Sequence, residues 1–191
     1  ALYIGIICDT GVFKYSNTSR HTMDMAGCLM EKGIPALTSF WGIVYAGGFY
    51  VFFNPELPIA RLQQMQQVLG ARRVITDKDY AETARQGFAP EAVCFVEECR
   101  ETPVREQALQ EVRNRMIDTD PLYANFTSGS TGTPKGVVVS HRSVLDFIDV
   151  FVPLFHITEK DRIANQAPFD FDVSVKDIYS AIKTGATLVT V

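Results

Sequence analysis

The chain has 191 residues, of which 47% are hydrophobic and 21% are charged. This composition is typical of a globular domain that buries a core, and it excludes a disordered or low-complexity chain. The formal net charge is −4 and there is no dense run of Lys and Arg, so neither nucleic acid nor a membrane is expected as a partner.

The chain opens with an apolar segment, residues 1–8, and carries four cysteines. The segment is much shorter than a membrane span and no basic residue precedes it, so it is interpreted as a strand and not as a signal peptide. Cys8, Cys28, Cys94 and Cys99 form no CxxC pair and have no spaced His partner, which argues against a zinc site. Buried thiols in a reducing compartment are the simpler interpretation, and a cytoplasmic location is expected.

Hydrophobic runs alternate with amphipathic stretches, which predicts an α/β fold of layered sheets covered by helices. The apolar run 49–53, between Gly-Gly and Asn-Pro, predicts a strand buried on both faces. Pro58 then begins a helix, and Gly70 stands where a left-handed residue would end it. Three residues share the apolar face of this helix: Leu62, Met65 and Leu69. A strand is predicted next, at 73–76.

Residues 104–116 place an apolar residue at every fourth position and predict a surface helix with one buried stripe. This stripe consists of Val104, Ala108, Val112 and Met116. Two strands, 122–126 and 136–140, are predicted next, joined by a loop of small residues. A one-sided helical stripe follows, with core packing as its predicted role: Val144, Phe147, Ile148, Phe151, Val152 and Phe155. A last amphipathic helix ends at Gly185, and a strand is predicted at 187–191.

The loop 127–136 reads TSGSTGTPKG and holds five hydroxyl residues, three glycines and a lysine. The glycines permit positive φ, so successive backbone N–H groups can face one concavity that suits an anion. The hydroxyls can donate to phosphate oxygens, and Lys135 adds a positive charge. The pattern predicts a loop that binds a triphosphate.

Two alternatives to a triphosphate loop of this kind are weaker. A Walker A loop needs its second glycine where Pro134 stands and a magnesium-binding hydroxyl where Gly136 stands, so an ordinary P-loop NTPase is not expected. A merely flexible Ser/Gly hairpin is disfavoured because Pro134 fixes its own φ and restrains Thr133.

The loop string, preceded by Tyr123 and followed by VVVSH, resembles the phosphate-loop signature of the adenylate-forming superfamily. That superfamily includes acyl-CoA synthetases, luciferases and amino-acid adenylation domains. Residues 42–58 with Arg61 are similar to the family's LKAGGAYVPLDPxxPxxR stretch. Residues 171–188 resemble the FDxS and GATL segments of the amino-acid-activating branch, which includes nonribosomal peptide synthetases. The resemblance covers most of 30–191.

This resemblance implies that the chain belongs to the large N-terminal domain of an enzyme that activates an amino acid with ATP and Mg²⁺. In the family, the loop holds the β- and γ-phosphates and orients the pyrophosphate leaving group. The implied cofactor-binding residues are Thr127, Ser128, Gly129, Ser130, Thr131, Gly132 and Lys135. The implied partners are an amino-acid substrate and a phosphopantetheinyl carrier protein, whose thiol receives the activated amino acid.

Asp172 has two interpretations. It directly precedes the last amphipathic helix, where Asp is a favoured N-cap. By resemblance it matches the aspartate that binds the α-ammonium of the substrate in amino-acid adenylation domains, and this role is preferred. Phe171 is expected beside it as an aromatic wall, with a core position as the alternative. Lys176, one helical turn further, could reach the same pocket and favour an acidic side chain, or it could be solvated.

Several motifs of the family are missing from residues 1–191: the adenine-binding segment, the ribose-binding aspartate, the hinge and the C-terminal catalytic lysine. The chain is therefore expected to be an incomplete N-terminal portion without the C-terminal domain, and alone to be a poor or inactive catalyst. Residues 174–179 are similar to the D-alanine–carrier protein ligases. Two competing functions stay open. One is an acyl-CoA or acyl-AMP ligase, in which Asp172 is only a cap, and the other is a non-catalytic nucleotide-binding module.

Overall fold

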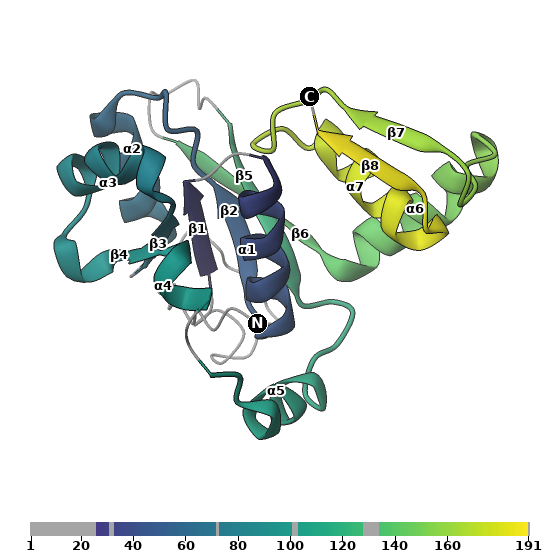
Figure 1. Cartoon of the computed structure of the whole chain (residues 1–191), viewed down its shortest axis with the longest axis horizontal. Coiled ribbons are helices and arrows are strands. Elements are labelled where there is room, and N and C mark those ends of the chain that lie inside the picture. Colours follow the sequence, from purple (N-terminus) through teal and green to yellow (C-terminus); the bar gives the residue numbers. More distant parts are fainter. Residues whose placement is uncertain (1–25, 31–32, 72, 101–102, 128–133, 191) are drawn as a thin grey trace.

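The computed structural model describes residues 26–30, 33–71, 73–100, 103–127 and 134–190, and these form two parts that lie side by side (Figure 1). We call them the sheet part and the C-terminal part. The sheet part consists of β1 (Ala26–Met30), α1 (Gly33–Tyr45), β2 (Phe49–Phe52), α2 (Ile59–Leu69), β3 (Val74–Thr76), η1 (Lys78–Tyr80), α3 (Ala81–Gly87), η2 (Pro90–Ala92), β4 (Val93–Phe95), α4 (Val96–Arg100), α5 (Glu106–Arg113), β5 (Pro121–Thr127) and β6 (Lys135–Ser140). The C-terminal part consists of α6 (His141–Leu154), β7 (Arg162–Asn165), α7 (Val173–Thr184) and β8 (Thr187–Thr190).

The strands of the sheet part form one sheet in the order β4-β3-β1-β2-β5-β6. The first five strands are parallel, and β6 runs antiparallel to β5. Tyr50 of β2 lies opposite Tyr123 of β5. Since parallel strands end at the same edge, the loops that follow β2 and β5 leave from one edge of the sheet. In open α/β sheets this carboxyl edge is where ligands bind.

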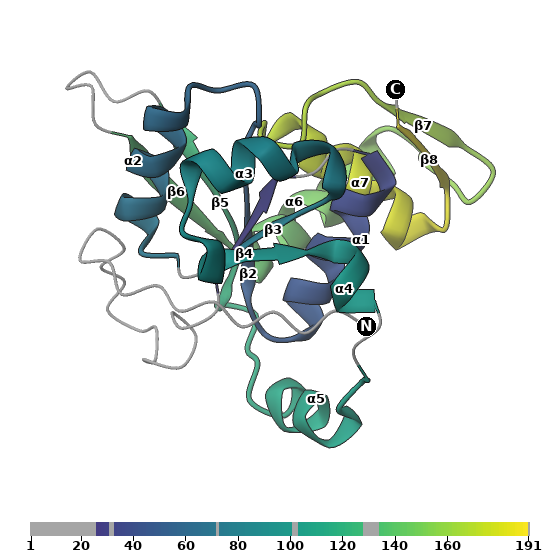
Figure 2. The same ribbon diagram turned by 60° about the vertical axis from the view of Figure 1, so that its left-hand side comes forward.

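Helices cover both faces of this sheet. Helix α1 lies on one face, and α2 and α3 lie on the other, an arrangement that Figure 2 shows. The strand order, in which the chain first runs from β1 to β2 and then back to β3 and β4, gives this arrangement when every crossover has the usual right-handed sense. Phe40 and Ile43 of α1 are fully buried, as are Leu62 and Leu69 of α2. The sheet part therefore holds a core on each side of the sheet, as the predicted layered α/β fold requires.

Several predicted elements of the sheet part are confirmed. Strand β2 is buried at all four positions, as expected of a strand covered on both faces. The apolar face of α2 consists of the three predicted residues, and Gly70 ends the helix with φ 65° and ψ 19°. Strands β3, β5 and β6 lie where the sequence placed them. The predicted strand 1–8 lies outside the described residues.

The predicted stripe over 104–116 is wrong. Helix α5 covers only Glu106–Arg113, Val104 is 39% exposed, and the buried residue is Leu109, which the stripe omitted. The physical reason is the helical period, because each step of four residues turns the direction of the side chain by about 40°. Over twelve residues these side chains rotate around the helix axis by about 120°, so they cannot all face the same neighbouring element.

The predicted core role of the α6 stripe holds for only half of its members. Val144, Ile148 and Val152 are buried, whereas Phe147 is 47% exposed and Phe155 is 61% exposed. These two rings lie tilted against Phe151, with centroid distances of 5.3 and 4.5 Å. Helix α6 packs against α7 and β6 on one side only, so the aromatic half of its apolar face is uncovered among the described residues.

The last predicted elements are confirmed. Helix α7 ends at Gly185, which adopts φ 78°, and β8 follows and pairs in parallel with β7. Cys94 and Cys99 carry thiols and are half-buried, where burial was expected. No helix within the described residues has the length and apolar character that a membrane crossing requires.

Candidate functional site

The predicted phosphate loop leaves the carboxyl end of β5 and returns at β6. Thr127 and Lys135 lie opposite each other in the antiparallel ladder, both are exposed, and the Thr127 hydroxyl donates to the Lys135 carbonyl at 3.4 Å. Five of the predicted cofactor-binding residues lie outside the described residues: Ser128, Gly129, Ser130, Thr131 and Gly132. The two that are described flank the loop at the carboxyl edge of the sheet.

The turn that carries Asp172 lies over the same edge. Phe169 packs against Phe52 at the end of β2, with ring centroids 5.4 Å apart. In the orientation of the Asn125 amide that satisfies both of its polar ends, its nitrogen donates to the Ala124 carbonyl (3.1 Å) and its oxygen accepts from the Asp172 N–H (3.2 Å). The turn is thus attached to the ends of both β2 and β5.

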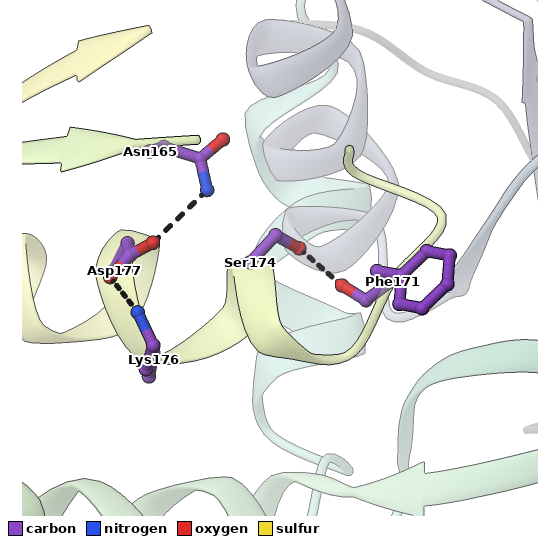
Figure 3. Close-up of polar contacts among 5 residues, drawn as sticks. All are labelled: Asn165, Phe171, Ser174, Lys176 and Asp177. Carbon is purple, nitrogen blue, oxygen red and sulfur yellow. Dashed lines mark hydrogen bonds and ion pairs between the residues drawn. The ribbon is translucent and has the colours of Figure 1, made fainter. Parts of the chain in front are cut away.

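The local geometry of Asp172 does not support its interpretation as a helix cap. The residue stands at the N-cap position of α7, but its backbone is helical (φ −60°, ψ −24°) and its side chain makes no capping hydrogen bond. Instead the Ser174 hydroxyl donates to the Phe171 carbonyl at 2.7 Å and shapes the first turn (Figure 3). The exposed carboxylate of Asp172 is therefore available to a ligand.

Aromatic residues surround this turn. Phe171 is 60% exposed, so the alternative core position is wrong, while its role as a wall stays a prediction. Tyr123 stacks on buried Tyr50, with centroids 5.7 Å apart. Burial, and secondarily the charge of Asp172, raise the pKa of the Tyr123 phenol. The phenol is thus a neutral polar neighbour of the carboxylate.

Sequence reasoning missed Asn125, which attaches β5 to the Asp172 turn. A signal for it was present. Alternate residues of a strand point to the same side, so Tyr123, Asn125 and Thr127 share one face of β5. The last of these opens the predicted phosphate loop, and a polar residue two positions before it was a candidate for the same site.

Lys176 belongs to a separate polar cluster, shown in Figure 3. Its ammonium lies 2.5 Å from the carboxylate of Asp177, and the other carboxylate oxygen accepts from the Asn165 amide at 3.3 Å. Asn165 and Asp177 are buried, and the Lys176 side chain is 34% exposed. Lys176 is thus partly exposed to solvent and pairs with Asp177, and its predicted reach into the pocket of Asp172 stays a prediction.

The amino-acid sequence of the chain is similar to those of known proteins. Residues 21–191 match the family model described as AMP-binding enzyme. The chain is 33% identical over 168 residues to tyrocidine synthase 1 of Brevibacillus parabrevis, covering 87% of this chain and 15% of that protein. Residues 1–191 thus span a small fraction of the length of such relatives.

Solved structures give the same result. The nonribosomal peptide synthetase FmoA3 bound to α-methyl-L-serine-AMP matches with a TM-score of 0.71 and 28% identity, covering 86% of this chain and 18% of that one. Its AMPPNP-bound form matches with a TM-score of 0.72 and 29% identity, covering 86% of this chain and 17% of that one. The architecture is that of the N-terminal domain of adenylate-forming enzymes, and the chain belongs to the AMP-binding, adenylate-forming enzyme family, with adenylation domains of nonribosomal peptide synthetases among its relatives.

Proposed function

We propose that this protein uses ATP to activate an amino acid as an aminoacyl-adenylate, which is then transferred to the thiol of a carrier protein. Residues 1–191 serve as the N-terminal, phosphate-binding portion of that enzyme. The observation that carries the proposal is the attachment of the Asp172 turn to Phe52 and Asn125. It brings a carboxylate suited to an ammonium group beside the strand that leads into the phosphate loop.

Each end of the proposed site has its own role. ATP supplies the electrophilic α-phosphate that the substrate carboxylate attacks. Lys135 and the Thr127 hydroxyl flank the loop that holds the β- and γ-phosphates and orients the leaving pyrophosphate, together with the loop residues Ser128, Gly129, Ser130, Thr131 and Gly132. Asp172 holds the α-ammonium, so that the carboxylate of the same substrate points toward the α-phosphate. Phe171 lies beside it as an aromatic wall.

The donor set fits a magnesium ion that arrives with the nucleotide. No group of three His, Cys, Asp or Glu side chains among the described residues could hold a metal ion. Mg²⁺ at phosphate-transfer sites is usually held by the substrate phosphates, waters and one or two protein oxygens, so a dedicated protein cage is not needed. The hydroxyls of the loop are the protein oxygens available for this purpose.

A single charge-removing substitution in the full-length enzyme tests the proposal. Asp172→Asn should leave the free energy of unfolding nearly unchanged, because the side chain makes no capping bond. Loss of the only carboxylate partner of a bound ammonium should cost about 2–5 kcal/mol of binding. Amino-acid-dependent exchange of pyrophosphate into ATP should therefore fall by roughly tenfold to a few thousandfold.

Asp146→Asn, which removes an exposed carboxylate from α6, is the matched control and should retain full exchange. Full amino-acid activation by Asp172→Asn would contradict the proposal and favour the acyl-ligase alternative. A structure with ATP gives an independent check, because β- or γ-phosphate oxygens should lie within hydrogen-bond distance of the loop between Thr127 and Lys135.

A further inference from the structure

The start of α7 receives a hydrogen-bond acceptor from a strand of the sheet part. With its amide in the orientation that satisfies both polar ends, Asn125 of β5 donates to the Ala124 carbonyl at 3.1 Å and accepts from the Asp172 N–H at 3.2 Å. Backbone N–H groups at the start of a helix have no partner within that helix. The Asn125 amide therefore satisfies such a donor from outside α7, and both of its own polar ends are occupied.

Few other contacts hold the backbone at Asp172. The neighbouring side chains of Phe171 and Val173 are 60% and 48% exposed, so they add little packing. The Asp172 side chain makes no capping hydrogen bond. Phe169 anchors the turn to β2, but it does so three residues earlier. Among the described residues, the Asn125 amide is thus the contact that ties the backbone of Asp172 itself to the sheet part.

This hydrogen bond also determines where the carboxylate of Asp172 can lie. The donating nitrogen and Cβ are bonded to the same Cα, so a fixed N–H fixes the direction in which the side chain leaves the backbone. From a fixed Cα–Cβ bond the side chain has only a few staggered rotamers. The carboxylate is exposed, and its position therefore follows from the backbone that Asn125 holds.

The same strand also leads into the predicted phosphate loop. Asn125 and Thr127 share one face of β5 and are two residues apart, which is about 7 Å along a strand. Both are held in the antiparallel ladder with β6, where Asn125 lies opposite Val137 and Thr127 lies opposite Lys135. The amide and the start of the loop therefore keep a fixed separation.

We propose that Asn125 is a positioning residue for amino-acid activation. Through the Asp172 N–H it holds the Asp172 carboxylate at a set distance from the phosphate loop, so that the bound amino acid presents its carboxylate to the α-phosphate of ATP. Asn125 acts through Asp172 and touches neither substrate. This inference rests on the proposed function, and it assigns to β5 the alignment of the two substrates.

One substitution in the full-length enzyme tests this role. Asn125→Leu keeps a branched side chain of similar length but removes both hydrogen bonds. Because a displacement of about 1 Å can cost about a hundredfold in rate, kcat/KM for the amino acid in pyrophosphate exchange should fall by about ten- to hundredfold, with a higher KM. The KM for ATP should stay within about twofold, because the groups that flank the phosphate loop are unchanged.

A double-mutant cycle tests whether Asn125 acts through Asp172. In an enzyme that already carries Asp172→Asn, the carboxylate to be positioned is absent. Adding Asn125→Leu to that variant should therefore lower kcat/KM for the amino acid by less than about threefold. Two independent roles would instead give effects that multiply.

Asn114→Leu is the matched control. The Asn114 amide accepts from the Gln110 amide at 3.0 Å on the exposed surface of α5, so the substitution also removes a hydrogen bond of an asparagine. Helix α5 precedes β5, whereas the phosphate loop follows it, and Figure 1 shows α5 beyond the other end of the strand. Both KM values should be unchanged. Thermal unfolding checks the folding of each variant, and a KM does not depend on how much of the enzyme is folded.

Three outcomes would overturn the inference. Asn125→Leu could behave like Asn114→Leu, it could raise the KM for ATP as much as the KM for the amino acid, or it could have its full effect in the Asp172→Asn enzyme. The second outcome would assign Asn125 to the general structure of β5. Failure of the proposed function gives a different result, because the wild-type enzyme would then show no exchange that depends on an amino acid.

Discussion

The sheet part and the C-terminal part differ in how much of what they bury is polar. Strands β2 and β3 are buried at every position, and the cores around them consist of large apolar residues from helices on both faces. The C-terminal part has a smaller apolar core from α6 and α7, leaves other large apolar residues of α6 exposed, and buries four polar residues: Asn165, Ser174, Asp177 and Ser180. Asp172 lies where the two parts meet, since its N–H donates to Asn125 of β5.

The largest expected effect is the loss of stability when a buried ring of the sheet part is removed, compared with the removal of an exposed ring of α6. Phe40 is fully buried, and its ring centroid lies 4.4 Å from the ring centroids of both Trp41 and Tyr50. Phe40→Ala should cost about 3–5 kcal/mol of unfolding free energy. Phe147→Ala on α6 should cost less than about 0.5 kcal/mol in the 191-residue chain, because the ring is 47% exposed. Urea titration measures both, and equal costs would show that the outer face of α6 is covered in solution.

The same contrast explains what the sequence predicted well. Periodicity located β2 and α2 correctly because each is surrounded by its own neighbours, so an apolar residue on the expected face is a buried one. It failed on α6, where the stripe is wide and the packed neighbours cover only half of it. Periodicity reports which residues can be buried, and Phe147 and Phe155 show that it does not report whether a neighbour is present.

The candidate site was predictable only in part, for a related reason. Residues that belong to a sequence motif, such as Thr127, Lys135 and Asp172, could be selected from the sequence. The contact between Asn125 and Asp172 joins residues 47 positions apart in the chain, and no local pattern encodes it. The Lys176–Asp177 pair joins neighbours in sequence, yet helical geometry argues against it, so only the folded environment of the buried carboxylate reveals it.

Two glycines with nearly the same backbone give the second prediction. Gly47 has φ 79° and lies against α5, so that a Cβ added there would overlap Val112 Cγ1. Gly185 has φ 78°, but its nearest neighbour, Glu159 Cβ, would lie 3.8 Å from an added Cβ. Gly47→Ala should therefore cost about 2–4 kcal/mol from conformation and overlap together, and Gly185→Ala about 1 kcal/mol from conformation alone. Thermal or urea unfolding of the two variants measures the difference, and equal costs would mean that α5 moves aside.

The third prediction concerns pH and His141, which joins the two parts at the start of α6. Burial lowers the pKa of this imidazole, an effect that nearby Asp120 and Asp118 partly oppose. Its Nε2 is buried and has no hydrogen-bond partner among the described residues. Because the folded-state pKa lies below the unfolded value of about 6.5, the unfolded chain binds more protons as the pH falls. Stability should be complete above about pH 6.5 and decline below it. His141→Gln should remove this decline, and an unchanged pH profile would assign it to other groups.

The smallest expected effect comes from the ion pair between Lys183 and Asp149, which links α7 to α6 at the surface. Their side chains are 40% and 64% exposed, so water screens the attraction, and ordering two mobile side chains offsets much of what remains. Asp149→Asn should change the unfolding free energy by less than about 0.5 kcal/mol, and raising the salt concentration should reduce even that difference. Asp177→Asn removes the same kind of charge from a site that is 7% exposed, so its effect on stability should be larger and almost independent of salt. Urea titrations of both variants at low and high salt measure the contrast. If the two substitutions respond alike to salt, Asp177 is solvated, and it can no longer be treated as the buried partner that holds Lys176.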